Sequence, residues 1–168
     1  MRLNCPQLLS VLLAAGCATA PPPGNFPRST RSFPADALIT QRAVLTARGR
    51  QFTLNGYLAQ SGTGGKRLIL MENFSSALAD VLVKPDGTVH VMRSSRIFRP
   101  AWVERYVAAD MLCIFGDSAN AACPVRMLSP THFAIERHPY YKLDLQIVEI
   151  KPGPQPAELF DEMHKTIP

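Results

Sequence analysis

The chain has 168 residues, of which 46% are hydrophobic, and its formal net charge is +5 at pH 7. This length suits one domain with a buried core and shorter accessory segments. The basic residues are scattered and form no block with interleaved aromatic side chains, which argues against nucleic-acid binding. A mild positive charge suits proximity to an anionic lipid surface, and solvated faces explain it equally well.

The N-terminus carries the pattern of a bacterial lipoprotein signal. Arg2 precedes an apolar run from Leu8 to Ala15, and Gly16 stands immediately before Cys17. The run is too short to remain in a bilayer as a spanning helix, and the small residues before the cysteine fit the cleft of a signal peptidase. We therefore expect residues 1–16 to be a lipoprotein signal peptide and Cys17 to be the lipidation site. The alternative is an ordinary signal peptide or an N-terminal helix that contains a cysteine.

The residues after Cys17 predict a tether and a destination. Ala18 stands where an aspartate typically retains bacterial lipoproteins in the inner membrane, so similarity to these proteins implies the outer membrane and its periplasmic face. Residues 17–37 are rich in proline and show no periodicity, which predicts a lipid-anchored tether. At ~3.1 Å per residue, an extended tether of about twenty residues could hold the domain up to ~60 Å from the membrane.

Residues 38–151 are predicted to form the folded domain, as a meander of antiparallel strands. Apolar and polar residues alternate in short runs that are separated by turns. Lys84-Pro85-Asp86-Gly87 is a strong hairpin turn, because proline fixes the first φ and glycine accepts the positive one. The predicted strands are 51–58, 67–71, 79–83, 88–92, 133–137 and 141–150.

A change of period after Arg99 predicts a helix from Pro100 to Phe115. Proline suits the first helical turn, and apolar residues recur at helical spacing: Val103, Val107, Met111 and Ile114. The helix is apolar around most of its girth, so it must be buried against another element. The expected fold class is α+β: a curved antiparallel β-sheet covered by one main helix.

The predicted helix carries most of the candidate ligand-binding residues. Trp102 and Tyr106 either fill the space between helix and sheet or line its mouth for a ligand. The cavity candidates are Trp102, Tyr106, Val107, Met111, Phe52 and Leu54. Asp110 lies on the apolar helix and needs a partner, such as an arginine or backbone amides. We expect it to make a structural hydrogen bond that fixes the helix on the sheet; a polar anchor at one end of a cavity is the alternative.

The cysteines and histidines favour structure over catalysis. Cys113 and Cys123 predict a disulfide that closes a loop of about ten residues and contributes ~2–3 kcal/mol in an oxidising compartment; two separately buried thiols are the alternative. No phosphate-binding loop or nucleophile elbow is present. The four histidines, His90, His132, His138 and His164, lack metal-ligand spacing. We therefore expect no metal, no cofactor and no enzymatic activity, although catalytic residues need not form local motifs.

Three stretches carry a resemblance to a known family. The turn Lys84–Gly87, the segment Phe98–Asp110 and the segment Tyr140–Leu145, together with the lipid anchor, are similar to a family of proteobacterial lipoproteins with a domain of unknown function. The resemblance covers roughly residues 40–150. It implies a half-barrel like that of LolA and LolB, which bind acyl chains between a curved sheet and covering helices, and an association with aryl-polyene biosynthesis.

The chain departs from the LolB pattern in one loop. LolB-like receptors present a bulky apolar residue on a protruding loop, whereas Ser61–Gly65 holds no hydrophobic residue, and Phe74 in the neighbouring turn is the substitute on offer. This departure argues against general lipoprotein insertion but not against the binding of a hydrophobic molecule.

The sequence therefore predicts an outer-membrane lipoprotein that faces the periplasm and binds or carries a hydrophobic molecule, such as an acyl, lipid or aryl-polyene-like chain, without catalysis. The alternative is a lipid-anchored structural or interaction protein of the cell envelope. The expected partners are the membrane, through the lipid anchor, a hydrophobic ligand and an envelope protein. Residues 152–168 are predicted to be a flexible tail with at most one short helix, Glu158 to His164.

Overall fold

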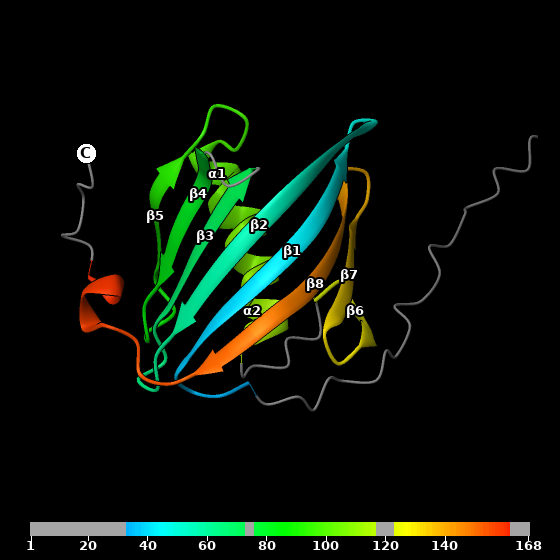
Figure 1. Cartoon of the computed structure of the whole chain (residues 1–168). Coiled ribbons are helices and arrows are strands. Elements are labelled where there is room, and N and C mark those ends of the chain that lie inside the picture. Colours follow the sequence, from blue (N-terminus) through cyan, green and yellow to red (C-terminus); the bar gives the residue numbers. More distant parts are fainter. Residues whose placement is uncertain (1–32, 73–75, 117–122, 162–168) are drawn as a thin grey trace, which may run out of the picture.

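In the part of the chain that the structure describes, eight antiparallel strands form one sheet, and one long helix lies against one of its faces (Figure 1). The computed structural model describes residues 33–72, 76–116 and 123–161. The predicted signal peptide, Cys17, the first part of the predicted tether, Phe74 and His164 lie outside the described residues. The antiparallel α+β architecture predicted from the sequence is confirmed.

The strands follow the chain in two meanders joined through β1 and β8. The order across the sheet is β5-β4-β3-β2-β1-β8-β7-β6, so β5 and β6 form its two edges. The sheet is neither closed nor strongly curled. The strands are β1 (Ala37–Ala47), β2 (Arg50–Gln60), β3 (Lys66–Glu72), β4 (Ser76–Val83), β5 (Val89–Ser94), β6 (Val125–Ser129), β7 (His132–Arg137) and β8 (Tyr141–Pro152).

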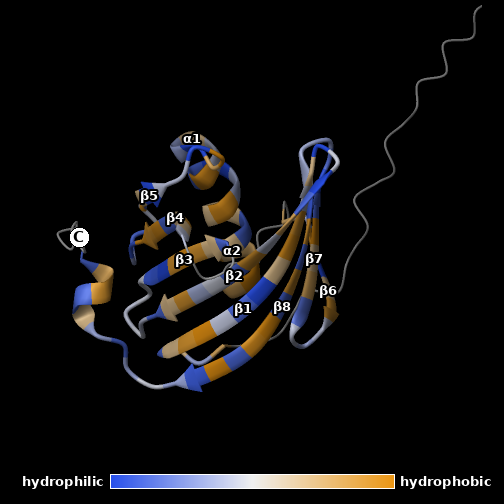
Figure 2. Ribbon diagram, turned by 45° about the horizontal axis from the view of Figure 1, so that its top comes forward, coloured by the Kyte–Doolittle hydropathy of each residue, from blue (hydrophilic) through white to orange (hydrophobic). Residues whose placement is uncertain are grey.

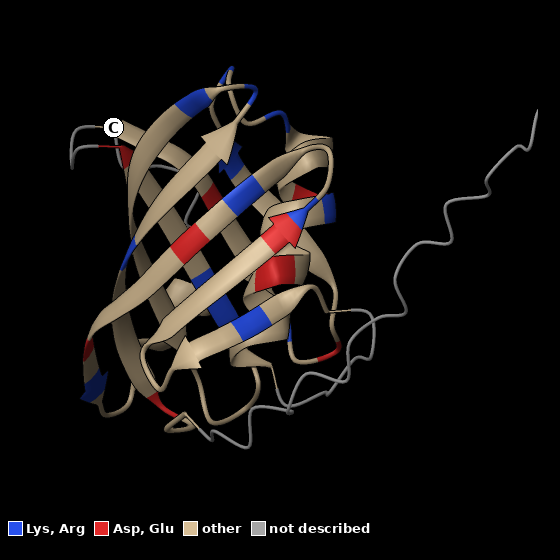
Figure 3. Cartoon of the chain, turned by 90° about the vertical axis from the view of Figure 1, so that its right-hand side faces the viewer, with Lys and Arg blue, Asp and Glu red and all other residues tan. Residues whose placement is uncertain are grey.

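Alternation along the strands gives the sheet an apolar inner face. In β1, Ile39, Ala43 and Leu45 are buried, while Arg42 and Val44 between them are exposed. Because side chains of a strand point alternately to opposite faces, the buried set lies on one face. Figure 2 shows hydrophobic bands crossing the strands, and Figure 3 shows acidic and basic residues interspersed along them.

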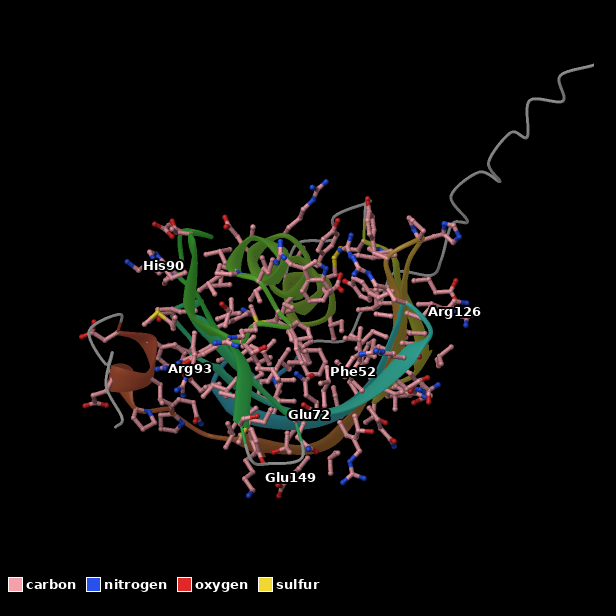
Figure 4. The ribbon with its side chains drawn as sticks, turned by 90° about the horizontal axis from the view of Figure 1, so that it is seen from above. Phe52, Glu72, His90, Arg93, Arg126 and Glu149 are labelled. Carbon is pink, nitrogen blue, oxygen red and sulfur yellow. A yellow bond between two sulfur atoms is a disulfide. The ribbon has the colours of Figure 1, made fainter. Side chains whose placement is uncertain are left out.

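The helix covers this inner face, as the view from above shows (Figure 4). It runs without interruption through α1 (Pro100–Trp102), η1 (Val103–Ala108) and α2 (Ala109–Phe115), which matches the predicted bounds. The segment η1 is π-helical, a geometry that is rare and frequent at functional sites. Val103 and Met111 are almost fully buried against the core.

The folded domain begins earlier than predicted. The ring of Phe33 packs on Phe115 with 5.0 Å between centroids. The backbone N–H of Gly62 donates to Asp36 Oδ1 at 2.7 Å, and the side chain of Gln60 donates to the carbonyl of Pro34. Residues 33–37, which composition assigned to the tether, are therefore part of the domain.

The described part of the C-terminal segment packs on the outer face of the sheet. It contains one short 3-10 helix, η2 (Ala157–Phe160), which contacts β3. Arg67 Nη1 donates to the carbonyl of Leu159 at 3.1 Å, and the ring of Phe160 lies against Gly65. Residues up to Asp161 thus form a strap over β3, where composition predicted a flexible tail.

Candidate functional site: an apolar cavity under the helix

A cavity of about 50 Å³ lies between the helix and the sheet. Its walls come from β1, β2, β3, β8 and the helix, with Phe98 from the segment before it. The lining consists of Gln41, Ala43, Leu45, Leu54, Gly56, Leu68, Leu70, Phe98, Trp102, Val107, Asp110, Met111, Ile114, Tyr141, Leu143 and Leu145. This volume accepts a few water molecules or a small apolar group, and it is well below the ~300–1,000 Å³ of a pocket for a drug-sized ligand.

The structure brings four of the six predicted cavity residues together. Leu54, Trp102, Val107 and Met111 line the cavity. Phe52 and Tyr106 do not line it, although both pack against the same core. Phe52 lies on the helix side of the sheet (Figure 4), one inward position along β2 from Leu54.

An aromatic cluster borders the cavity at the start of the helix. The Trp102 ring packs on Phe98, Tyr106 and Tyr141 with centroid distances of 5.1, 5.5 and 5.4 Å. Aromatic pairs at such distances stabilise the fold by more than the burial of their surface alone would. Of the two aromatic residues whose role the sequence left open, Trp102 faces the cavity, whereas Tyr106 packs outside it against Tyr140 at 5.6 Å.

Asp110 has the arginine partner that the sequence predicted it to need. Arg137 on β7 donates from Nε and Nη2 to Asp110 Oδ1 at 2.8 and 2.6 Å. The hydroxyl of Tyr141 on β8 donates to Asp110 Oδ2. These bonds tie the helix to two strands, as expected of a structural anchor.

Burial sets the ionisation of this cluster. Only 5% of Asp110 is exposed, and this desolvation raises the pKa of its carboxyl above the usual value, although hydrogen bonds from Arg137 and Tyr141 oppose the rise. Burial, with Asp110 beside it, also raises the pKa of the Tyr141 hydroxyl. Tyr141 therefore stays protonated and donates its hydrogen bond to Asp110, which holds the helix on the sheet.

A polar side chain that sequence reasoning missed belongs to the cavity lining. Gln41 on β1 is only 3% exposed, and its Oε1 accepts no hydrogen bond from any residue in the described ranges. Its side chain covers Gly56, which stands opposite it on β2. A Cβ at Gly56 would lie 2.6 Å from Gln41 Cγ and Nε2, so only glycine leaves room for this side chain.

The predicted disulfide is present, and the alternative of two separate thiols is therefore wrong. Cys113 in α2 and Cys123 are bonded with a Cα–Cα distance of 5.6 Å. The bond ties the last turn of the helix to the segment that leads into β6.

The described residues offer no assembled centre for metal chemistry. Among residues 33–72, 76–116 and 123–161, no three His, Cys, Asp or Glu side chains gather in a way that could hold a metal ion. His132 pairs with Asp144 at 2.9 Å on the exposed face, away from the cavity. Within the same ranges, every helix is too short or too polar to cross a membrane.

Comparison with protein-family models and with curated proteins gave no match for this chain. The resemblance to the proteobacterial lipoproteins therefore stays a prediction from the stretches quoted above.

Proposed function

We propose that this chain is an outer-membrane lipoprotein that faces the periplasm and binds or carries a hydrophobic molecule without chemically changing it. The observation that carries the proposal is the apolar cavity between the helix and the inner face of the sheet. An acyl, lipid or aryl-polyene-like chain would be held by burial of its surface, at ~25 cal/mol per Å².

The ligand would enter by parting the helix from the sheet. A cavity of about 50 Å³ takes only the end of a long chain, so the remainder needs space that the helix must yield. Two features support such a movement. The long side chain of Met111 adapts readily to a new packing, and the π-helical segment η1 is next to the cavity.

The proposed architecture is a half-barrel of the kind seen in LolA and LolB. An open antiparallel sheet with one helix against its inner face supports this assignment. A lipid on Cys17 would keep the domain at the membrane. The Cys113–Cys123 bond is weak support for a location outside the cytoplasm, because disulfides persist in oxidising compartments.

The test is to purify residues 18–168 from the periplasm of the native host without detergent and to analyse an organic extract by absorbance and mass spectrometry. We expect a stoichiometric hydrophobic molecule. The cavity-filling variant Ala43→Leu should lose it, because Ala43 is 6% exposed and lines the cavity. The matched control Ala101→Leu, on the exposed side of the helix start, should retain it.

The small cavity volume also favours a second candidate, a lipid-anchored structural or interaction protein whose core is simply filled. An extract without ligand, together with failure to bind fatty-acid probes, would contradict the carrier proposal and support this alternative.

A further inference from the structure

One buried acceptor in the cavity lining, Gln41 Oε1, has no hydrogen-bond donor among the described residues. Gln41 is 3% exposed and belongs to the cavity lining, yet its Oε1 accepts no hydrogen bond from any residue that the structure describes. A buried acceptor without a donor is costly and rare in folded proteins. Gly56 makes the space that this side chain occupies, so the amide is accommodated by a specific neighbour.

No residue of the described lining donates a hydrogen bond to this oxygen. The donors of the Asp110 cluster are already committed, because Arg137 and Tyr141 both donate to Asp110. Apart from the indole of Trp102, the remaining neighbours in the cavity are hydrocarbon, such as Leu54 and Leu143.

We propose that the ligand is an amphiphile that enters with its polar end first and donates a hydrogen bond to Gln41 Oε1. This inference rests on the proposed function. The chemical class is an alcohol, an amide or a protonated acid with an apolar chain. A pure hydrocarbon would leave the amide unpaired, and an ionised carboxylate would bring a second acceptor and an unpaired charge into an apolar space.

Two isomeric probes test this assignment. Hexan-1-ol has a hydroxyl donor, whereas methyl pentyl ether has the same atoms and only an acceptor. Trp102, the one tryptophan of the chain, lines the cavity, so its fluorescence reports binding directly. Titrations use residues 18–168, which include every contact described here between residues 33 and 161.

We expect wild type to bind the alcohol about tenfold more tightly than the ether, the effect of one buried hydrogen bond. In Gln41→Met, which keeps the shape and removes the acceptor, the two probes should bind equally. In the control Gln146→Met, on an exposed position of β8, the tenfold preference should remain.

The contrary outcomes separate the two proposals. Equal binding of both probes to wild type, or tighter binding of the ether, overturns the donor assignment and leaves the hydrophobic cavity standing. A preference for the alcohol that persists in Gln41→Met overturns the role of Gln41. Binding of neither probe contradicts the proposed function itself. If Gln41→Met folds poorly, the comparison of the two probes on wild type decides.

Discussion

Asp110 is the one buried carboxylate among the described residues, and its partners determine how much it contributes to stability. A buried ion pair gains attraction between its charges and loses their hydration, so its presence alone is weak support for stability. Removing one partner is different, because the other charge then stays buried without compensation. Arg137, whose side chain is 21% exposed, is the partner to remove.

We expect Arg137→Met to lower the free energy of unfolding by about 3 kcal/mol, at the low end for a broken buried pair since the guanidinium is partly solvated. Urea unfolding measures this. Lys142→Met is the matched control: its pair with Glu136 has side chains that are 69% and 63% exposed, and it should cost less than about 1 kcal/mol. Equal losses in the two variants would contradict the anchoring role of Asp110.

The raised pKa of Asp110 gives stability a defined dependence on pH. An acid with a higher pKa in the folded state binds its proton there first, so its contribution is fully present below the unfolded value of 3.8 and is lost as the pH rises through the folded pKa. The difference in unfolding free energy between wild type and Asp110→Asn should therefore fall with rising pH just above 3.8.

Asp86 gives the opposite dependence of stability on pH. The backbone N–H of Thr88 lowers the pKa of this exposed carboxyl, so its contribution is present above the unfolded value and is lost as the pH falls through the folded pKa. Urea titrations of Asp110→Asn and Asp86→Asn between pH 3 and 7 should give slopes of opposite sign. Parallel slopes would refute the assigned burial effect at Asp110.

The close contact between β1 and β2 makes a prediction at the scale of the element. In Gly56→Ala, the new methyl group collides with Gln41, and we expect a loss of about 1–3 kcal/mol from overpacking. Shortening the obstructing side chain in Gln41→Ala/Gly56→Ala should recover part of that loss. A double-mutant cycle measures the coupling, and simple additivity would mean that the two side chains do not compete for the same space.

The junction between the helix and β6 is held by the disulfide. Closing a loop of 10 residues restricts the unfolded chain, so Cys113→Ser/Cys123→Ser should lose about 3 kcal/mol. Chemical denaturation of the oxidised wild type and the variant gives the value. The reduced wild type should match the variant; an unchanged midpoint after reduction would show that the bond contributes nothing to stability.

The sequence predicted the elements whose pattern is regular and missed those whose pattern is interrupted. Strand β2 and the helix have clear periodicity, and both were predicted close to their observed bounds. Strand β6 was missed because it is an edge strand with a largely exposed sequence. Strand β1 is absent from the predicted strands because Gln41 places a polar residue where an apolar one would continue the alternation.

The polar residue Gln41 in β1 also limits how much of the cavity could be predicted from the sequence. The helix side of the cavity was visible in the sequence, since Trp102, Val107 and Met111 follow helical spacing. The sheet side of the cavity was not visible in the sequence, because the pairing of Gln41 with Gly56 depends on strand register. Local pattern carries no information about register between strands until the turns that join them are known.

At the scale of the whole molecule, the proposed lipid on Cys17 would determine where the protein resides. We expect metabolic labelling with an alkyne-bearing palmitate to tag wild type in the outer-membrane fraction. Cys17→Ala should lose both the label and the outer-membrane location, while Cys5→Ala, which alters a residue within the predicted signal peptide, should keep both. A labelled Cys17→Ala protein would refute the assigned lipidation site.

The boundaries of the domain were hidden from composition for a physical reason. Prolines and small polar residues predict segments without regular structure, yet such segments can still pack. Phe33 does so against Phe115, and η2 does so over β3, each through one apolar ring. Deleting residues 157–168 should therefore destabilise the domain by the loss of the Phe160 contact and the Arg67 hydrogen bond.

The arrangement of β1 and β8 also has a mechanical consequence. The chain enters β1 at Ala37 and leaves β8 at Pro152, and these two residues are partners at one end of adjacent central strands. A pull that separates the two chain ends therefore loads this ladder like a zipper, one pair at a time, and the fifth pair to part is Gln41 with Ile147. Tension between an N-terminus held at the membrane and a C-terminus held by a partner would therefore separate the strands pair by pair at low force, and would not shear a whole strand at once. It would reach Gln41, on the sheet side of the cavity, early in this process.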